Sequence, residues 1–194
     1  MDIVLGILLG AAFVAGLVWA RTRWAGFTAQ TPEDYAAAGP DFDIRRHLNG
    51  RLACEGMIYG PTGRVTSRFV ADFDARWDGD SGVMSEHFRY DSGTVQDREW
   101  RLSLDPDGRI RAEAEDLVGA GRGRQAGSGV RLDYTIRLPE AAGGHMLDVV
   151  DWMYLLENGT IMNRSQFRKY GITVAELVAT IRPANEAAEK RSAA

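Results

Sequence analysis

The stretch VTSRFVADFDARW, residues 65–77, decides the fold. Its odd positions are mostly apolar, as at Phe69 and Phe73, and its even positions are polar or charged apart from Val70. This period of two is typical of a β-strand with one buried face. The stretch has 13 residues, whereas a typical strand has about 5–6. The sequence therefore predicts a strand that bends or crosses a curved sheet.

Further alternating segments follow at regular intervals along the chain. They cover residues 84–90, 100–104, 110–114, 130–138, 149–156 and 161–167. Turn sequences separate them, most clearly Asp-Pro-Asp-Gly at 105–108 and Asn-Gly at 158–159. Closing such a meander into a barrel removes the unpaired edges of the sheet. We expect an all-β domain over residues 42–182, an antiparallel lipocalin/calycin-like β-barrel of roughly eight to ten strands, with a two-sheet sandwich as the alternative.

A linker precedes this domain. Residues 25–41 contain the breakers Pro32 and Pro40 and show no clear period. Residues 43–49 then predict one or two helical turns, which end at Gly50.

The last segment of the domain fits two structures. Thr173 followed by Glu176 matches a helix capping box. The apolar side chains of Ile172, Val174 and Val178 instead fit a strand. We favour the strand, which would close the barrel, and we expect residues 183–194 to form a flexible tail.

The N-terminal residues 1–24 predict a helix that anchors the chain in a membrane. No charged or hydroxyl side chain interrupts residues 3–20, which span about 27 Å as a helix against a bilayer core of about 30 Å. A cleaved signal peptide is the alternative, although Asp2 stands where such peptides carry Lys or Arg. Arg21 and Arg23 follow the apolar run and favour a cytoplasmic domain by the positive-inside rule.

Gly6 and Gly10 form a G-x-x-x-G pattern inside the helix. Such spacing lets two membrane helices approach closely, although membrane helices are rich in glycine in any case. A homodimer through this face is therefore one hypothesis for the anchor.

Composition narrows the function classes. The 194 residues carry a formal net charge of -4, so no basic footprint for nucleic acid is present. The three histidines, His47, His87 and His145, are scattered and indicate no metal site. Cys54, the single cysteine, has no base nearby in sequence and is expected to be a packed side chain. We find no catalytic motif and no cofactor motif.

Large aromatic and polar side chains fall on alternating positions that we expect to face the barrel interior. A small barrel of this kind is either filled by its side chains or leaves room for one apolar ligand. Glu86 would need a partner there, because an isolated buried carboxylate is costly, and Arg164 is one candidate. The candidate ligand-binding residues are Trp77, Glu86, Phe88, Tyr90, Trp100, Tyr134, Trp152, Tyr154, Asn163 and Arg164.

A series of sequence blocks extends through the whole domain. The blocks are Phe42-Asp43, Leu48-Asn49-Gly50, Arg68-Phe69, Trp77-Asp78-Gly79, Glu86 to Tyr90, Trp100, Asp116 to Gly119, Tyr134, Asp151-Trp152-Met153-Tyr154, Asn163-Arg164 and Lys169 to Ile172. Together they resemble the bacterial DUF3833 family of uncharacterised, often lipoprotein-type envelope proteins. The resemblance implies an envelope protein without an established activity, and the frequent neighbourhood of genes similar to cyclopropane-fatty-acid synthases implies acyl-chain chemistry at membranes. The lipobox cysteine of many members is absent here, so the apolar helix would replace the lipid anchor.

Three functions remain open from the sequence. The first is a barrel, tethered to the bacterial inner membrane by a single-pass helix, that binds a fatty-acyl or other apolar ligand in membrane lipid metabolism. The second is an acyl-lipid-modifying enzyme that uses Glu86 or Asp151 with Tyr90 or Tyr154 as acid and base. The third is a structural partner in a membrane complex. The two arginines favour a cytoplasmic domain, and the family resemblance implies a periplasmic one.

Overall fold

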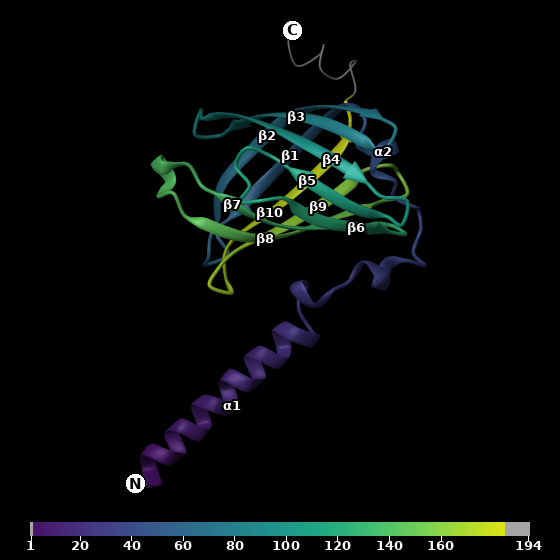
Figure 1. Ribbon diagram of the computed structural model, residues 1–194. Coiled ribbons are helices and arrows are strands. Elements are labelled where there is room, and N and C mark those ends of the chain that lie inside the picture. Colours follow the sequence, from purple (N-terminus) through teal and green to yellow (C-terminus); the bar gives the residue numbers. More distant parts are fainter. Residues whose placement is uncertain (1, 185–194) are drawn as a thin grey trace.

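A computed structural model describes residues 2–184 of the chain as a closed antiparallel barrel of ten strands with one long helix extending from it (Figure 1). Each strand pairs with the next one along the chain, and the last pairs with the first from Leu52↔Pro183 to Tyr59↔Glu176. The predicted barrel is confirmed, and the sandwich is wrong. The strands are β1 (Gly50–Tyr59), β2 (Val65–Asp78), β3 (Ser81–Tyr90), β4 (Val95–Leu104), β5 (Arg109–Glu113), β6 (Gly121–Ala126), β7 (Gly129–Arg137), β8 (Met146–Leu155), β9 (Ile161–Lys169) and β10 (Ile172–Pro183).

The long strand β2 behaves as its alternation predicts. Phe69, Ala71 and Phe73 are buried inside the barrel, whereas Val70 is 49% exposed on the outer face. The strand spans 14 residues and pairs with both β1 and β3 along most of its length. The last predicted strand, β10, also forms, and its pairing with β1 closes the sheet.

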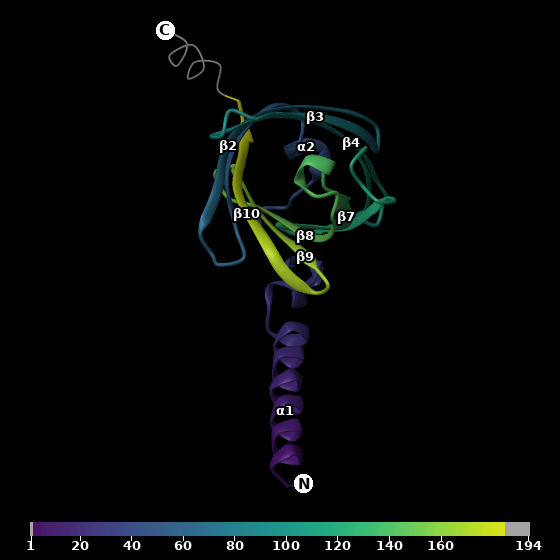
Figure 2. The ribbon, with the colours of Figure 1, turned by 90° about the vertical axis from the view of Figure 1, so that its left-hand side faces the viewer.

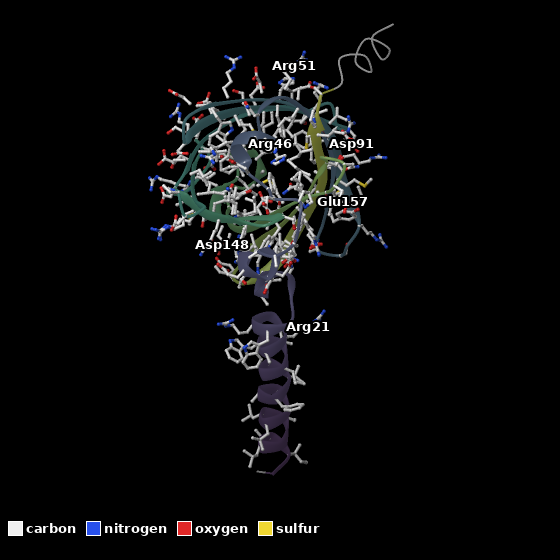
Figure 3. The ribbon with its side chains drawn as sticks, turned by 90° about the vertical axis from the view of Figure 1, so that its right-hand side faces the viewer. Arg21, Arg46, Arg51, Asp91, Asp148 and Glu157 are labelled. Atoms are coloured by element: carbon white, nitrogen blue, oxygen red, sulfur yellow. The ribbon has the colours of Figure 1, made fainter. Side chains whose placement is uncertain are left out.

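The short helix α2 (Ile44–His47) covers one end of the barrel. Asp43 caps it by accepting a hydrogen bond from the Arg45 backbone N–H, and the side chains of Ile44 in the helix and of Leu48 at its end are buried. The Trp77 indole donates a hydrogen bond of 2.8 Å to the carbonyl of Leu48, which holds the helix on the barrel. Figure 3 views the barrel from this side, with α2 over its opening.

The far end of the barrel, opposite α2, is formed by the other set of strand connections (Figure 1). One of these connections carries the short helix η3 (Glu140–Ala142). In Figure 2, which looks toward this end, η3 stands within the outline of the barrel. The connections are residues 60–64, 91–94, 114–120, 138–145 and 170–171.

The predicted linker packs against the outer wall of the barrel. It contains two short 3₁₀ helices, η1 (Phe27–Ala29) and η2 (Pro32–Tyr35). The Tyr35 ring packs edge-on against Trp152 at 5.4 Å and against Tyr154 at 5.2 Å. The Arg131 guanidinium donates a 2.5 Å hydrogen bond to the carbonyl of Gln30. These contacts fix the chain to β7 and β8 before it reaches α2.

The helix α1 (Asp2–Trp24) extends away from the barrel, and its side chains are almost all exposed (Figures 1 and 2). It is the one described helix that is long and apolar enough to cross a membrane, and an N-terminal signal sequence meets the same criterion. At the other terminus, β10 ends at Pro183 and the Ala184 N–H donates to the Arg51 carbonyl. The remaining residues of the expected tail, 185–194, lie outside the described residues.

Candidate functional site

The interior of the barrel is only partly filled. A partly open cavity of about 110 Å³ lies among the inward side chains of most strands and is bounded at one end by Ile44 and Leu48. Its walls are mainly apolar and include Phe73, Phe88 and Trp100. A group of polar side chains interrupts the apolar wall. The members of this polar cluster are Glu86, Arg98, Tyr134, Asp151, Asn163 and Ser165.

Arg98 is the cation of the polar cluster. It precedes Trp100 by two residues on β4, so the strand period directs both side chains inward. Its Nε donates a 3.1 Å hydrogen bond to Asp116, and its guanidinium lies 4.0 Å from the centre of the Trp100 ring. The Nη2 nitrogen is buried and has no hydrogen-bond partner among residues 2–184. Burying a hydrogen-bond donor without a partner costs free energy, and an acceptor placed next to this nitrogen would remove that cost.

Glu86 is the carboxyl group that the strand register places beside Arg98. The two residues are direct partners across β3 and β4, and Glu86 is only 7% exposed. Burial raises the pKa of the Glu86 carboxyl to about 7, and the Arg98 charge and the Trp100 indole oppose that rise. Glu86 therefore gains and loses its proton near neutral pH.

Asp151 is held by a small hydrogen-bond network on the opposite wall. Its carboxylate accepts from Asn163 Nδ2 at 2.5 Å, from Ser165 Oγ at 2.8 Å and from Tyr134 Oη at 3.4 Å. Burial raises the pKa of Asp151, and the hydrogen bonds from Ser165 and Asn163 oppose the change. The pKa of Tyr134 is also raised, by burial and by the nearby Asp151 charge, so the phenol remains a donor at neutral pH.

Seven of the ten predicted site residues face the interior, although they do not form one site. Glu86, Phe88, Trp100, Tyr134 and Asn163 line the cavity. Trp77 lies at the α2 end, where it binds the Leu48 carbonyl. Tyr90 lies toward the far end, where its ring packs against Phe69 and Phe88.

Trp152 and Tyr154 were expected inside the barrel, and that expectation is wrong. The inward positions of β8 are those of Asp151, Met153 and Leu155, so the two aromatic residues point outward. Trp152 is nevertheless fully buried, because Tyr35 of the linker covers it. Both faces of β8 are therefore apolar, and the sequence pattern could not show which face was the inner one.

Arg164 also lies outside the barrel, so this candidate partner of Glu86 is on the opposite face of the sheet. Its guanidinium forms an ion pair of 2.6 Å with Glu176 on the neighbouring strand and lies 4.6 Å from the centre of the Phe27 ring. The actual neighbour of Glu86 is Arg98, which the sequence reasoning missed. The alternation that places Trp100 and Leu102 inside extends back to Arg98 and could have identified it as an inward side chain, although not as the partner of Glu86.

Within residues 2–184, no group of three or more His, Cys, Asp and Glu side chains is arranged to hold a metal ion. Cys54 is buried at the cavity wall, and burial raises the pKa of its thiol. The groups that face the cavity offer hydrogen bonding by Arg98, Asp151 and Tyr134 and proton exchange at Glu86.

Two solved structures share the fold at low sequence identity. The S-type phycobiliprotein lyase CPES from Guillardia theta aligns with 81% of this chain and 99% of its own, at 11% identity and a TM-score of 0.57. Rv2717c from M. tuberculosis aligns with 72% of this chain and 94% of its own, at 14% identity and a TM-score of 0.53. At such identity the likeness shows the lipocalin-like barrel fold alone.

Among curated proteins, none matches the sequence. A family model described as a protein of unknown function, DUF3833, matches residues 22–183, which include every strand of the barrel. The chain belongs to the DUF3833 family.

Proposed function

We propose that this protein is a ligand-binding barrel, tethered to a membrane by α1, that encloses the apolar part of one small molecule and holds its polar group at Arg98. The observation that carries this proposal is the buried, unpartnered Nη2 of Arg98 at the wall of a partly open, mainly apolar cavity. Binding sites commonly combine apolar walls with a few convergent polar groups. The ligand would supply the acceptor that Nη2 lacks.

The volume of the cavity limits how much of a ligand the barrel can enclose. Pockets for drug-sized molecules usually measure roughly 300–1,000 Å³, whereas this cavity measures about 110 Å³. A fatty-acyl chain would therefore place only one end of its length inside. The flexible side chains of Met84 and Met153 line the wall and can make more room by changing rotamer.

The charges around Arg98 favour an uncharged polar group. Asp116 already pairs with Arg98 at 3.1 Å, and Glu86 and Asp151 lie in the same cluster. An added carboxylate would leave excess negative charge in a poorly solvated site, which is costly. A hydroxyl group or an ester or amide carbonyl would accept from Nη2 without that cost. An acyl ester or a fatty alcohol therefore fits the cluster better than a free fatty acid.

The experiment measures binding to the full chain in one detergent at fixed concentration. The protein is titrated with 1-decanol and with decanoate while tryptophan fluorescence is followed, and native mass spectrometry detects co-purified ligands. Trp100 beside Arg98 is the expected reporter. We expect binding of decanol in preference to decanoate.

Two variants of the same strand distinguish specific from non-specific binding. Arg98→Met removes the inward guanidinium, and Arg101→Met removes an exposed one. A hydrogen bond from a charged group contributes about 1.5–3 kcal/mol, so Arg98→Met should weaken binding by roughly 10- to 100-fold. Equal binding by parent and Arg98→Met, both folded by circular dichroism, would refute the proposal, as would a parent that binds no ligand.

A specific observation supports a second candidate, an enzyme acting on an acyl lipid. Glu86 has a pKa of about 7 beside the cavity, which suits a general acid or base near neutral pH. Asp151 and Tyr134 would be its partners, because Tyr154 lies outside the barrel. The test is the lipid profile of a deletion strain complemented with Glu86→Gln or Asp151→Asn. Full rescue by both variants would eliminate the enzymatic function.

The tether itself is part of the proposal. A single-pass anchor in a bacterial inner membrane predicts that the intact chain stays in the membrane after carbonate washing, whereas a cleaved signal sequence predicts a shorter protein that is released. Protease digestion of intact and permeabilised cells then reports the side of the membrane on which the barrel lies.

The helix face that carries Gly6 and Gly10 is a candidate surface for a homodimer. No atom lies within 4 Å of a Cβ built at either position, so a second helix can approach this face. Unchanged crosslinking of Gly6→Leu would exclude a dimer through that face.

A further inference from the structure

The exposed large apolar side chains of the barrel gather around its far end. Tyr170 is 92% exposed and Ile172 is 69% exposed, more than any other large apolar side chain of the described barrel. Of the other exposed large apolar side chains of the barrel, Val70, Val83 and Leu156 lie away from the far end. The others lie in or beside the connections of the far end. We name the following set the apolar rim: Met57, Val65, Val95, Val118, Met146, Tyr170 and Ile172.

The β9–β10 turn is the most exposed part of the apolar rim. Tyr170 has a positive φ of 51° and is followed by Gly171 at 79°, so the turn projects the Tyr170 side chain away from the sheet. The Lys169 ammonium lies 5.7 Å from the Tyr170 ring, and Arg168 donates to the Gly171 carbonyl. A tip with aromatic, aliphatic and basic side chains matches the composition of protein segments at the bilayer interface.

The same tip lies on the side of the barrel from which α1 extends. In Figure 1 the β9–β10 turn and the beginning of the linker lie on the same lower side of the barrel, and in Figure 2 they overlap. In Figure 1, α1 also runs from the barrel toward the far-end side. The exposed Trp24 stands at the end of α1, at the level expected for an interfacial indole.

The linker keeps the barrel close to the end of α1. Gln30 is fixed to the barrel wall, because its side-chain Oε1 accepts a hydrogen bond from Tyr154 Oη at 3.0 Å and its backbone carbonyl accepts one from the Arg131 guanidinium. Only residues 25–29 separate Trp24 from Gln30. Five fully extended residues span at most about 18 Å, so a helix inside a bilayer would hold the barrel at its surface.

We propose that the apolar rim rests on the surface of the bilayer that α1 enters, with Tyr170 and Ile172 inserted at the interface. The far end of the barrel then faces lipid, and α2 closes the end that faces water. An apolar ligand would reach the cavity from the membrane without crossing water. This inference rests on the membrane tether of the proposed function and is independent of ligand binding.

The test measures the depth of single labelled positions in the full chain, reconstituted in phosphatidylcholine vesicles. Tyr170→Cys carries an environment-sensitive fluorophore at the rim, and Glu157→Cys carries it at the β8–β9 turn beside the α2 end. The buried Cys54 should remain unlabelled, and labelling of the parent chain checks this. A fraction of the lipids bears a nitroxide on the acyl chain, which quenches only fluorophores in contact with it.

Insertion at the boundary between headgroups and acyl chains predicts at least a twofold fluorescence loss at position 170 and none at position 157. Absence of quenching at 170 in carbonate-resistant protein would overturn the rim contact while leaving the tether intact. Equal quenching at both positions would also overturn it. Disulfide formation between Tyr170→Cys chains without lipid quenching would assign the apolar rim to a second copy instead. Release of the chain by carbonate would refute the tether.

Discussion

Replacing Glu86 with glutamine should stabilise the protein at alkaline pH. Burial raises the pKa of Glu86 from 4.5 to about 7 in the folded chain. Between these two values the folded state binds more protons than the unfolded state, so stability is full below pH 4.5 and falls as pH rises through 7. A tenfold change in proton affinity corresponds to about 1.4 kcal/mol. The ionised carboxylate therefore costs about 3 kcal/mol at pH 8.

Glutamine has nearly the same shape and carries no charge, so Glu86→Gln should recover most of that free energy at pH 8 and little of it at pH 5. For a domain of this size, 1 kcal/mol shifts the melting temperature by roughly 2–4 °C. We expect the melting temperature to rise by about 6–12 °C at pH 8. Thermal unfolding followed by circular dichroism at both pH values measures the effect.

A matched carboxylate separates this effect from a general change in net charge. Glu99 lies on the neighbouring strand but faces outward, where it pairs with Arg101 at 3.1 Å. Glu99→Gln should change the melting temperature little at either pH, because exposed ion pairs contribute little. The reasoning would be refuted if Glu86→Gln had the same effect at pH 5 and pH 8. It would also be refuted by destabilisation at pH 8, which would mean that the attraction between Glu86 and Arg98 exceeds the cost of burial.

Three further changes test the packing. Tyr35→Ala removes two edge-on ring contacts worth roughly 0.5–1.5 kcal/mol each, so urea unfolding should show that the free energy of unfolding falls by about 1–3 kcal/mol. An unchanged free energy of unfolding would mean that the linker is not held to the barrel wall. Gly123→Ala would place a Cβ against the Arg131 carbonyl oxygen, and we expect about 1–3 kcal/mol of destabilisation in the same assay. Parent-like stability would contradict the close approach of β6 to its neighbour β7 at this position. The buried Cys54 thiol, with its raised pKa, should react with a thiol reagent only after unfolding; rapid labelling of the folded chain would contradict its burial.

The inward face of most strands could be predicted from the sequence, because one side of those strands meets solvent. On β2 the charged even positions define the outer face, and on β3 the same period places Glu86 with Met84 inside. The strand assignment of β10 over a helix also followed from its period, since a closed barrel needs a partner for β1.

The sequence failed where something other than solvent covers the outer face. On β8 the linker buries Trp152, so both faces are apolar and the period no longer distinguishes inside from outside. The partner of Glu86 could not be read from the chain either. Register between strands places Arg98 opposite it and sends Arg164 to the outer face, and register is fixed by the whole set of turns and pairings.

The sequence by itself determined a meander of strands with one polar and one apolar face, and an apolar helix before it. These properties are local, because they depend on the order of side chains within a few residues. Only the tertiary structure decided the register in which β10 pairs with β1, the packing of the linker over β8, and the position of Arg98 opposite Glu86 beside a cavity. Those contacts join residues distant in sequence, and their geometry exists only after all ten strands have found their register.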